Sequence, residues 1–220
     1  MGFLLVKGLK ISIMNIGSKD KAYHMDKRIG TRNIVITGLL LALEIVFQIA
    51  GNYLQIGLVN VNLTLVTVVL GAVLCGPLYG AILGFFNGIM ALFSPSTLAT
   101  FMPINPAATV LICFLKCTLA GVAAGYVYKL LKNKNKLVAL IVASILVPII
   151  NTGIFAIGSL IFFRSFLESG ISEKFPNIGA FLIFGIILWN FIFEFASSLI
   201  LGPSIGMILL KREEKTATQQ

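Results

Sequence analysis

Long apolar runs, separated by short polar or basic segments, dominate the chain. Between Ile45 and Leu115 no charged residue occurs. One membrane-spanning helix needs roughly 20 apolar residues, so this stretch holds at least two spans and the flanks of others. Glycine and proline interrupt the run at Cys75-Gly76-Pro77, which predicts a tight turn. The pattern therefore predicts an all-α integral membrane protein.

Interruptions of this kind along the chain predict six helices. Residues 94–106 contain three prolines and small polar side chains, and residues 164–176 are polar, so both segments are expected to be loops. The last helix contains Gly202-Pro203, where a break is expected. The predicted helices cover about residues 33–53, 63–75, 77–93, 107–131, 137–163 and 177–210.

The placement of lysine and arginine predicts an orientation. Seven basic residues precede the first helix, four lie around the connector after the fourth, and three follow the sixth. Only Arg164 and Lys174 fall in predicted outer loops. The positive-inside rule then places both termini in the cytoplasm of a six-helix bundle. The membrane domain is expected at 25–212, after an N-terminal extension (1–24) and before a C-terminal tail (213–220).

Composition narrows the function. Hydrophobic residues make up 58% of the chain and charged residues 11%, unlike in a soluble domain. The net charge is +9, but the basic residues flank apolar runs, so we expect no nucleic-acid partner. The three cysteines lie inside apolar runs, and His24 is the only histidine. Neither a disulfide framework, a metal site nor a cofactor is expected. The chain lacks a P-loop signature and a Ser-His pair at membrane depth, so we predict that it is not an enzyme.

Three ionisable residues lie at membrane depth: Glu44, Lys116 and Glu194. A charge there costs at least roughly 2.5–3.5 kcal/mol on insertion scales, so such residues are rare and face a partner or a wet cavity. Three interpretations stay open for Lys116 and Glu194. They form a structural ion pair, or Lys116 binds an anionic solute group with help from Glu194, or they relay protons. Glu44 is a candidate for pairing with a partner protein.

Amide side chains form a second group of candidates. An amide in lipid needs hydrogen-bond partners, which are either other helices or a solute. Asn190 and Glu194 are four residues apart and share one helix face. A partly apolar pocket with a few convergent polar groups is typical of small-molecule sites. The predicted solute-binding residues, besides the two charged ones, are Asn60, Asn62, Asn105, Asn151, Trp189 and Asn190.

Small residues recur every four positions on several predicted helices. This spacing places them on one helix face and lets two backbones approach closely. The bundle itself or a second membrane protein is the expected neighbour. The motifs are Gly38 and Ala42; Gly80, Gly84 and Gly88; Gly121 and Gly125; and Ser198, Gly202 and Gly206.

From about Met25 onwards the chain resembles the substrate-binding S components of energy-coupling factor (ECF) vitamin transporters. The resemblance rests on the size, the six helices, residues 38–42 (GLLLA) and residues 70–84 (LGAVLCGPLYGAILG). It implies a vitamin pocket near the outer face, no hydrolysis by this chain, and docking on a membrane coupling protein attached to two ATPases in a bacterial plasma membrane. The family's Ala-x-x-x-Ala docking pattern aligns with Gly38 and Ala42, and the glycine is a departure.

Short segments of the chain narrow the choice of substrate. Segments Ser94-Pro95-Ser96, Met102-Pro103 and Asn105-Pro106 resemble pantothenate-type members, and Lys116 suits a carboxylate. Pantothenate is therefore the best substrate prediction, with riboflavin or folate as alternatives. Two other functions stay open: a stand-alone proton-coupled secondary transporter or small efflux protein that uses Glu44 or Glu194, and a membrane scaffold without a solute.

Overall fold

The computed structural model describes residues 30–51, 55–56, 59–60 and 63–218. The chain divides into two compact units, Met1–Ile36 and Thr37–Gln220. The helix Gly30–Gly51 begins in the first unit and continues into the second. Its described residues are almost entirely helical.

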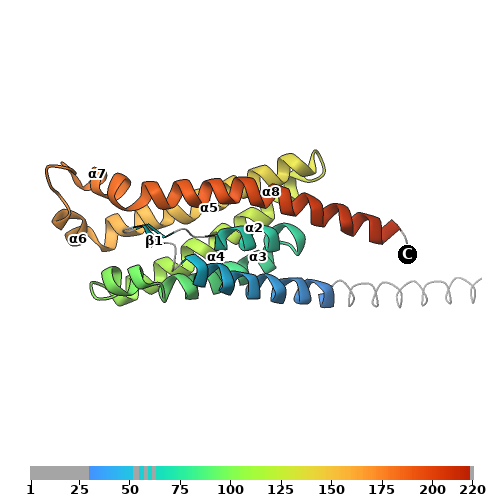
Figure 1. The fold of residues 1–220 in the computed structure, drawn as a ribbon, viewed down its shortest axis with the longest axis horizontal. Helices are drawn as coiled ribbons and strands as arrows, with labels where there is room; N and C mark the ends of the chain where they lie inside the picture. The colour runs from blue at the N-terminus through green and yellow to red at the C-terminus, as the bar shows by residue number, and fades with distance from the viewer. Residues whose placement is uncertain (1–29, 52–54, 57–58, 61–62, 219–220) are drawn as a thin grey trace, which may run out of the picture. The chain divides into compact units, whose positions relative to one another are not determined.

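Each of the six predicted segments contains helix, and further helical elements lie in the predicted loops. The helix Gly30–Gly51 is followed by a small antiparallel hairpin in which Gln55 pairs with Asn60. Figure 1 shows the long helices α4, α5 and α8 running side by side, with the shorter α2 and α3 among them. The elements are β1 (Gln55–Ile56), β2 (Val59–Asn60), α2 (Thr64–Leu74), α3 (Pro77–Leu92), η1 (Thr97–Phe101), α4 (Pro106–Leu131), α5 (Lys136–Phe162), α6 (Arg164–Ser169), α7 (Ile178–Ala180), η2 (Phe181–Ile187) and α8 (Leu188–Thr218).

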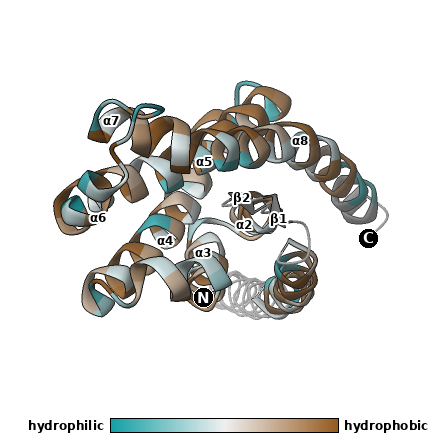
Figure 2. Ribbon diagram, turned by 60° about the vertical axis from the view of Figure 1, so that its left-hand side comes forward, coloured by the Kyte–Doolittle hydropathy of each residue, from teal (hydrophilic) through white to brown (hydrophobic). Residues whose placement is uncertain are grey.

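Four described helices are long and apolar enough to cross a membrane: Gly30–Gly51, Pro106–Leu131, Lys136–Phe162 and Ile178–Arg212. Two shorter apolar helices, α2 and α3, accompany them. Figure 2 shows hydrophobic residues along the long helices, and hydrophilic residues in the α6–α7 segment and near the C-terminus. The protein is thus an all-helical membrane protein, whereas the count of six spans and the side of each terminus stay predictions.

Three local features differ from the predictions. The expected loop 94–106 contains a π-helical turn, η1, and the expected loop 164–176 begins with helix α6. The break expected near Gly202-Pro203 was wrong, because α8 continues through both residues. Gly202 packs so closely on Ser144 of α5 that a Cβ at this position would collide with the serine hydroxyl. In membrane helices proline is tolerated because neighbouring helices and local adjustments re-satisfy the backbone groups that it frees.

Helices α3 and α4 pack along a line of glycines. A Cβ on Gly84 would meet the carbonyl of Cys117, and a Cβ on Gly80 would meet that of Gly121. The turn before α3 depends on Gly76, whose φ of 104° disfavours any other residue. The small-residue prediction for α3 and α4 is therefore confirmed as packing inside the bundle.

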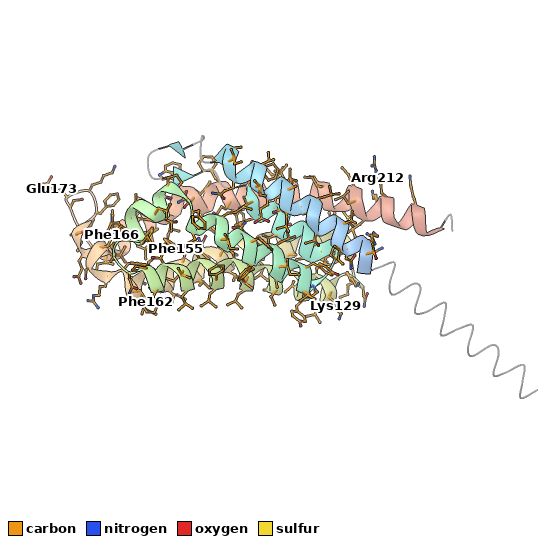
Figure 3. The ribbon with its side chains drawn as sticks, turned by 90° about the horizontal axis from the view of Figure 1, so that it is seen from below. Lys129, Phe155, Phe162, Phe166, Glu173 and Arg212 are labelled. Carbon is orange, nitrogen blue, oxygen red and sulfur yellow. The ribbon has the colours of Figure 1, made fainter. Side chains whose placement is uncertain are left out.

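Helix α2 forms the centre of the bundle, since all of its residues from Thr64 to Val73 are buried. Its partners are α3, α4, α5 and α8. An 11-residue helix that is enclosed by others does not need the length of a lipid-facing span. In Figure 3, Lys129 and Arg212 lie at one end of the bundle, and Phe166 and Glu173 lie at the other.

Candidate functional site

One cavity of about 380 Å³ opens among the helices towards the end that carries α6. Its wall comes from the helix Gly30–Gly51, the segment after α3, η1, α4, α5, α6, η2 and α8. It brings together residues that are far apart in the sequence. The polar members are Gln48, Ser94, Ser96, Thr97, Thr100, Lys116, Asn151, Thr152, Asn190 and Glu194, and the aromatic members are Phe47, Phe101, Phe155, Phe166 and Phe181.

Both π-helical segments line this cavity. η1 contributes Thr97, Thr100 and Phe101, and η2 contributes Phe181 and Ile186 among others. A π-turn adds a residue to a helical turn, so it redirects side chains and releases backbone groups, and such turns are common at functional sites. The two irregular segments thus supply hydroxyls and rings at the end of the cavity nearest α6.

Lys116 is the cationic residue in the cavity wall. It lies on α4, which begins at Pro106 and is capped by the Asn105 side chain accepting from the Ala108 amide. The Lys116 ammonium stands 5.3 Å from the centre of the Phe155 ring. In the part of the chain described here, a side-chain ion pair forms between Arg164 and Glu168 at the surface, whereas Lys116 has no carboxylate within 4.0 Å.

Glu194 belongs to the same wall and is only 7% exposed. Its Oε2 accepts a hydrogen bond of 3.3 Å from Nδ2 of Asn151 on α5. Among the described residues it therefore has an amide partner rather than a direct bond to Lys116. The structural ion pair of the sequence analysis is absent from this arrangement, and the charge on Lys116 faces the cavity.

A chain of buried side chains leads away from Glu194 into the bundle. The Cys117 thiol lies 3.5 Å from the amide oxygen of Asn151 and 3.5 Å from that of Asn87 on α3. Nδ2 of Asn87 donates to the Thr64 hydroxyl on α2 at 2.6 Å. Each member is buried. The amides were predicted to bond either with other helices or with a solute. Asn87 lies inside the bundle, whereas Asn151 lies at the cavity.

Glu44 lies elsewhere. It is fully buried and does not line the cavity. It faces Thr67 and Asn87, but neither of its carboxylate oxygens forms a hydrogen bond with good geometry among the described residues. The Glu44 cluster, meaning Glu44 with Thr64, Thr67 and Asn87, is therefore a second polar region separate from the cavity.

Two other predicted site residues, Asn105 and Trp189, do not line the cavity. Asn105 caps α4. Trp189 is 54% exposed on the surface of α8. Asn60 pairs through its backbone in β2, and Asn62 lies outside the described residues. Lys116, Asn151, Asn190 and Glu194 do converge on the cavity, and their role in binding stays a prediction.

Sequence reasoning missed the hydroxyls and rings of the cavity. Ser94 and Ser96 lie in the proline-containing segment whose likeness to pantothenate-type proteins was noted, so a signal was present for them. Ser94 donates to the Ala91 carbonyl and bonds with the Thr97 hydroxyl at 2.8 Å. The phenylalanines carried no signal, because 17 of them are scattered through the chain and most positions in lipid suit phenylalanine.

Comparison with known proteins gives one family. A sequence model described as "ECF transporter, substrate-specific component" matches residues 32–209. No curated protein and no solved structure matches the chain. The match covers every described helix except the ends of the first and last. The chain therefore belongs to the family of ECF transporter substrate-specific components, which are membrane proteins that bind the transported solute.

Proposed function

We propose that this substrate-specific component binds a small anionic vitamin in the cavity, with pantothenate as the best prediction. The observation that carries the proposal is the position of Lys116, a cation at membrane depth in the cavity wall with no carboxylate within 4.0 Å among the described residues. A charge in this environment is costly unless it is paired or solvated. A carboxylate on the solute would complete the pair and fix the orientation of the ligand.

Other polar residues of the cavity wall suit a solute whose remaining groups are polar but uncharged. Asn151 and Asn190 offer amides, and Thr97 and Thr100 offer hydroxyls. Asn190 is positioned by its own bond from Nδ2 to the Ile186 carbonyl at 3.3 Å. A vitamin with hydroxyl and amide groups matches this set, and a volume of about 380 Å³ lies near the small end of ligand sites.

The aromatic wall favours a second candidate. Five phenylalanines line the cavity, and three of them, Phe101, Phe166 and Phe181, stack in a row of edge and tilted contacts. Aromatic side chains bind ring systems through offset or edge contacts. Riboflavin or folate is therefore the alternative solute, since pantothenate has no ring to use this surface.

The proposal extends to orientation and partners. The end that carries Lys129 and Arg212 would face the cytoplasm of a bacterial cell, and the end with α6 and the cavity would face outward (Figure 3). Gly38 and Ala42 are both exposed, and a Cβ on Gly38 would meet nothing within 4 Å. This small-residue face is available to a membrane coupling protein that works with two ATPase subunits.

Mass spectrometry of the small molecules released when the purified protein is denatured tests the proposal. An anionic vitamin in about one-to-one amount is the expected result. A ring-bearing vitamin without a carboxylate would leave Lys116 without its assigned role. Uptake in membrane vesicles that follows a proton gradient and needs no ATPase subunits would instead favour the stand-alone transporter.

A further inference from the structure

Glu44 has a different environment from every residue of the cavity. On the helix Gly30–Gly51 it shares a buried face with Thr37 and Leu40, while Gly38 and Ala42 point away from the bundle. Its side chain is 0% exposed, and both carboxylate oxygens lack a hydrogen bond of good geometry among the described residues. A carboxylate ion enclosed without a partner is strongly disfavoured and becomes neutral instead.

The hydrogen-bonding groups around Glu44 indicate how it is neutralised. The hydroxyl of Thr67 lies 2.6 Å from the Thr64 carbonyl oxygen. A carbonyl oxygen carries no hydrogen, so the single hydroxyl proton of Thr67 is used in that bond. Thr67 can then only accept a hydrogen bond from Glu44, and an ionised carboxylate has no proton to donate.

Asn87 supplies the complementary group. Its amide oxygen faces the Cys117 thiol, and its Nδ2 donates to Thr64 Oγ1, so the amide nitrogen is on the side of Thr64 and Glu44. One of the two N–H bonds remains for Glu44. The surroundings thus offer one acceptor, on Thr67, and one donor, on Asn87. A neutral carboxylic acid has one O–H and one carbonyl oxygen, which is the matching pair.

No neighbouring group among the described residues supplies a positive charge that would neutralise an ionised Glu44. Among the described residues, the titratable side chain that interacts electrostatically with Glu44 is Cys117 on α4, and it is a thiol. α2 and α3 present Thr67 and Asn87, which do not titrate. Lys116 precedes Cys117 on α4, but its ammonium lies over Phe155 in the cavity. A metal cation is disfavoured, because the Asn87 group on this side is an N–H and not an oxygen ligand.

We infer that Glu44 is a proton-binding site, a neutral carboxylic acid whose O–H is donated to Thr67 and whose carbonyl oxygen accepts from Asn87. The bound proton allows the Thr37–Leu40–Glu44 face to be buried in the bundle, so that the Gly38–Ala42 face remains outward. The site is distinct from the cavity and does not depend on which solute the cavity binds.

Infrared spectroscopy of the full-length protein, with ¹³C-labelled glutamate, tests this assignment near neutral pH. A protonated glutamic acid has a C=O stretching band that an ionised carboxylate lacks. Wild type should show this band, and Glu44→Gln should lose the part of its intensity that Glu44 contributes. Glu168→Gln, at an exposed position, is the matched control and should retain it.

Glu194→Gln keeps the test decisive if Glu44→Gln does not fold, since Glu44 is then the buried glutamate left among the described residues. A band that persists in Glu194→Gln supports the assignment, and its absence there overturns it. A band of the same intensity in folded Glu44→Gln and in wild type also overturns it. So does a melting temperature that rises with NaCl but not with choline chloride in wild type alone, since that result would mean a bound sodium ion.

Discussion

Among the residues whose burial is described, two glutamates are buried in the helical bundle, and their surroundings differ. Glu194 lies in the wall of the cavity, where Asn151 donates to it and Lys116 stands on the same wall. Glu44 lies outside the cavity, enclosed by the Glu44 cluster, with no hydrogen bond of good geometry to either oxygen among the described residues. One carboxylate is next to a space that a solute can fill, and the other is enclosed by protein.

The comparison shows that buried polar residues in this membrane bundle have two different roles. Thr64, Asn87 and Cys117 join α2, α3 and α4 through hydrogen bonds, so these enclosed side chains hold helices together. Side chains at the cavity keep some of their capacity for a ligand. Asn87 and Asn190 represent the two regions, because both are amides on membrane helices but only Asn190 lines the cavity.

Replacing Asn87 with leucine should give the largest loss of stability. The change removes the donor to Thr64 and the acceptor for Cys117, and a buried hydrogen bond lost in this way costs about 1–3 kcal/mol. We expect a destabilisation of about 3 kcal/mol, measured by thermal or denaturant unfolding in detergent. Asn190→Leu, the matched change at the cavity, should cost stability less and solute affinity more. Equal losses of stability in the two variants would contradict the division.

A smaller effect is expected at Phe155, whose ring lies 5.3 Å from the Lys116 ammonium. Phe155→Leu keeps an apolar side chain but removes the cation–π contact, which is worth about 0.5–1 kcal/mol at partly exposed sites. Solute affinity should fall about threefold to fivefold by calorimetry. Phe162→Leu is the control, because Phe162 is on the same helix at 42% exposure and outside the cavity wall. The same loss in both variants would remove Phe155 from the site.

The sequence predicted the helices well because the apolar runs and their glycine and proline breaks are strong, local signals. Gly76-Pro77 ends one helix and begins the next as expected. The two π-helical segments were not predictable, since the helical register in them depends on packing with neighbours. The uninterrupted course of α8 through Pro203 was not predictable either, since whether a proline breaks a membrane helix depends on the groups around it.

The candidate site was predictable in part. Charged and amide residues are conspicuous in an apolar chain, which identified Lys116, Asn151, Asn190 and Glu194 as residues now found around one cavity. The same reasoning could not distinguish these from Asn105, whose side chain is used as a helix cap. It also could not place Glu44 beside Thr67 and Asn87, because contacts between distant segments leave no local pattern.

Solute binding by Lys116→Ala is the measurement that tests the central claim most directly. Isothermal titration with the vitamin found in the purified protein, or with pantothenate, should show affinity lower by about 100-fold than in wild type, which is about 2.7 kcal/mol and within the range for a hydrogen bond to a charged group. Lys129→Ala, at an exposed lysine on the same helix, should bind as wild type does. Wild-type affinity in a folded Lys116→Ala protein would contradict the account.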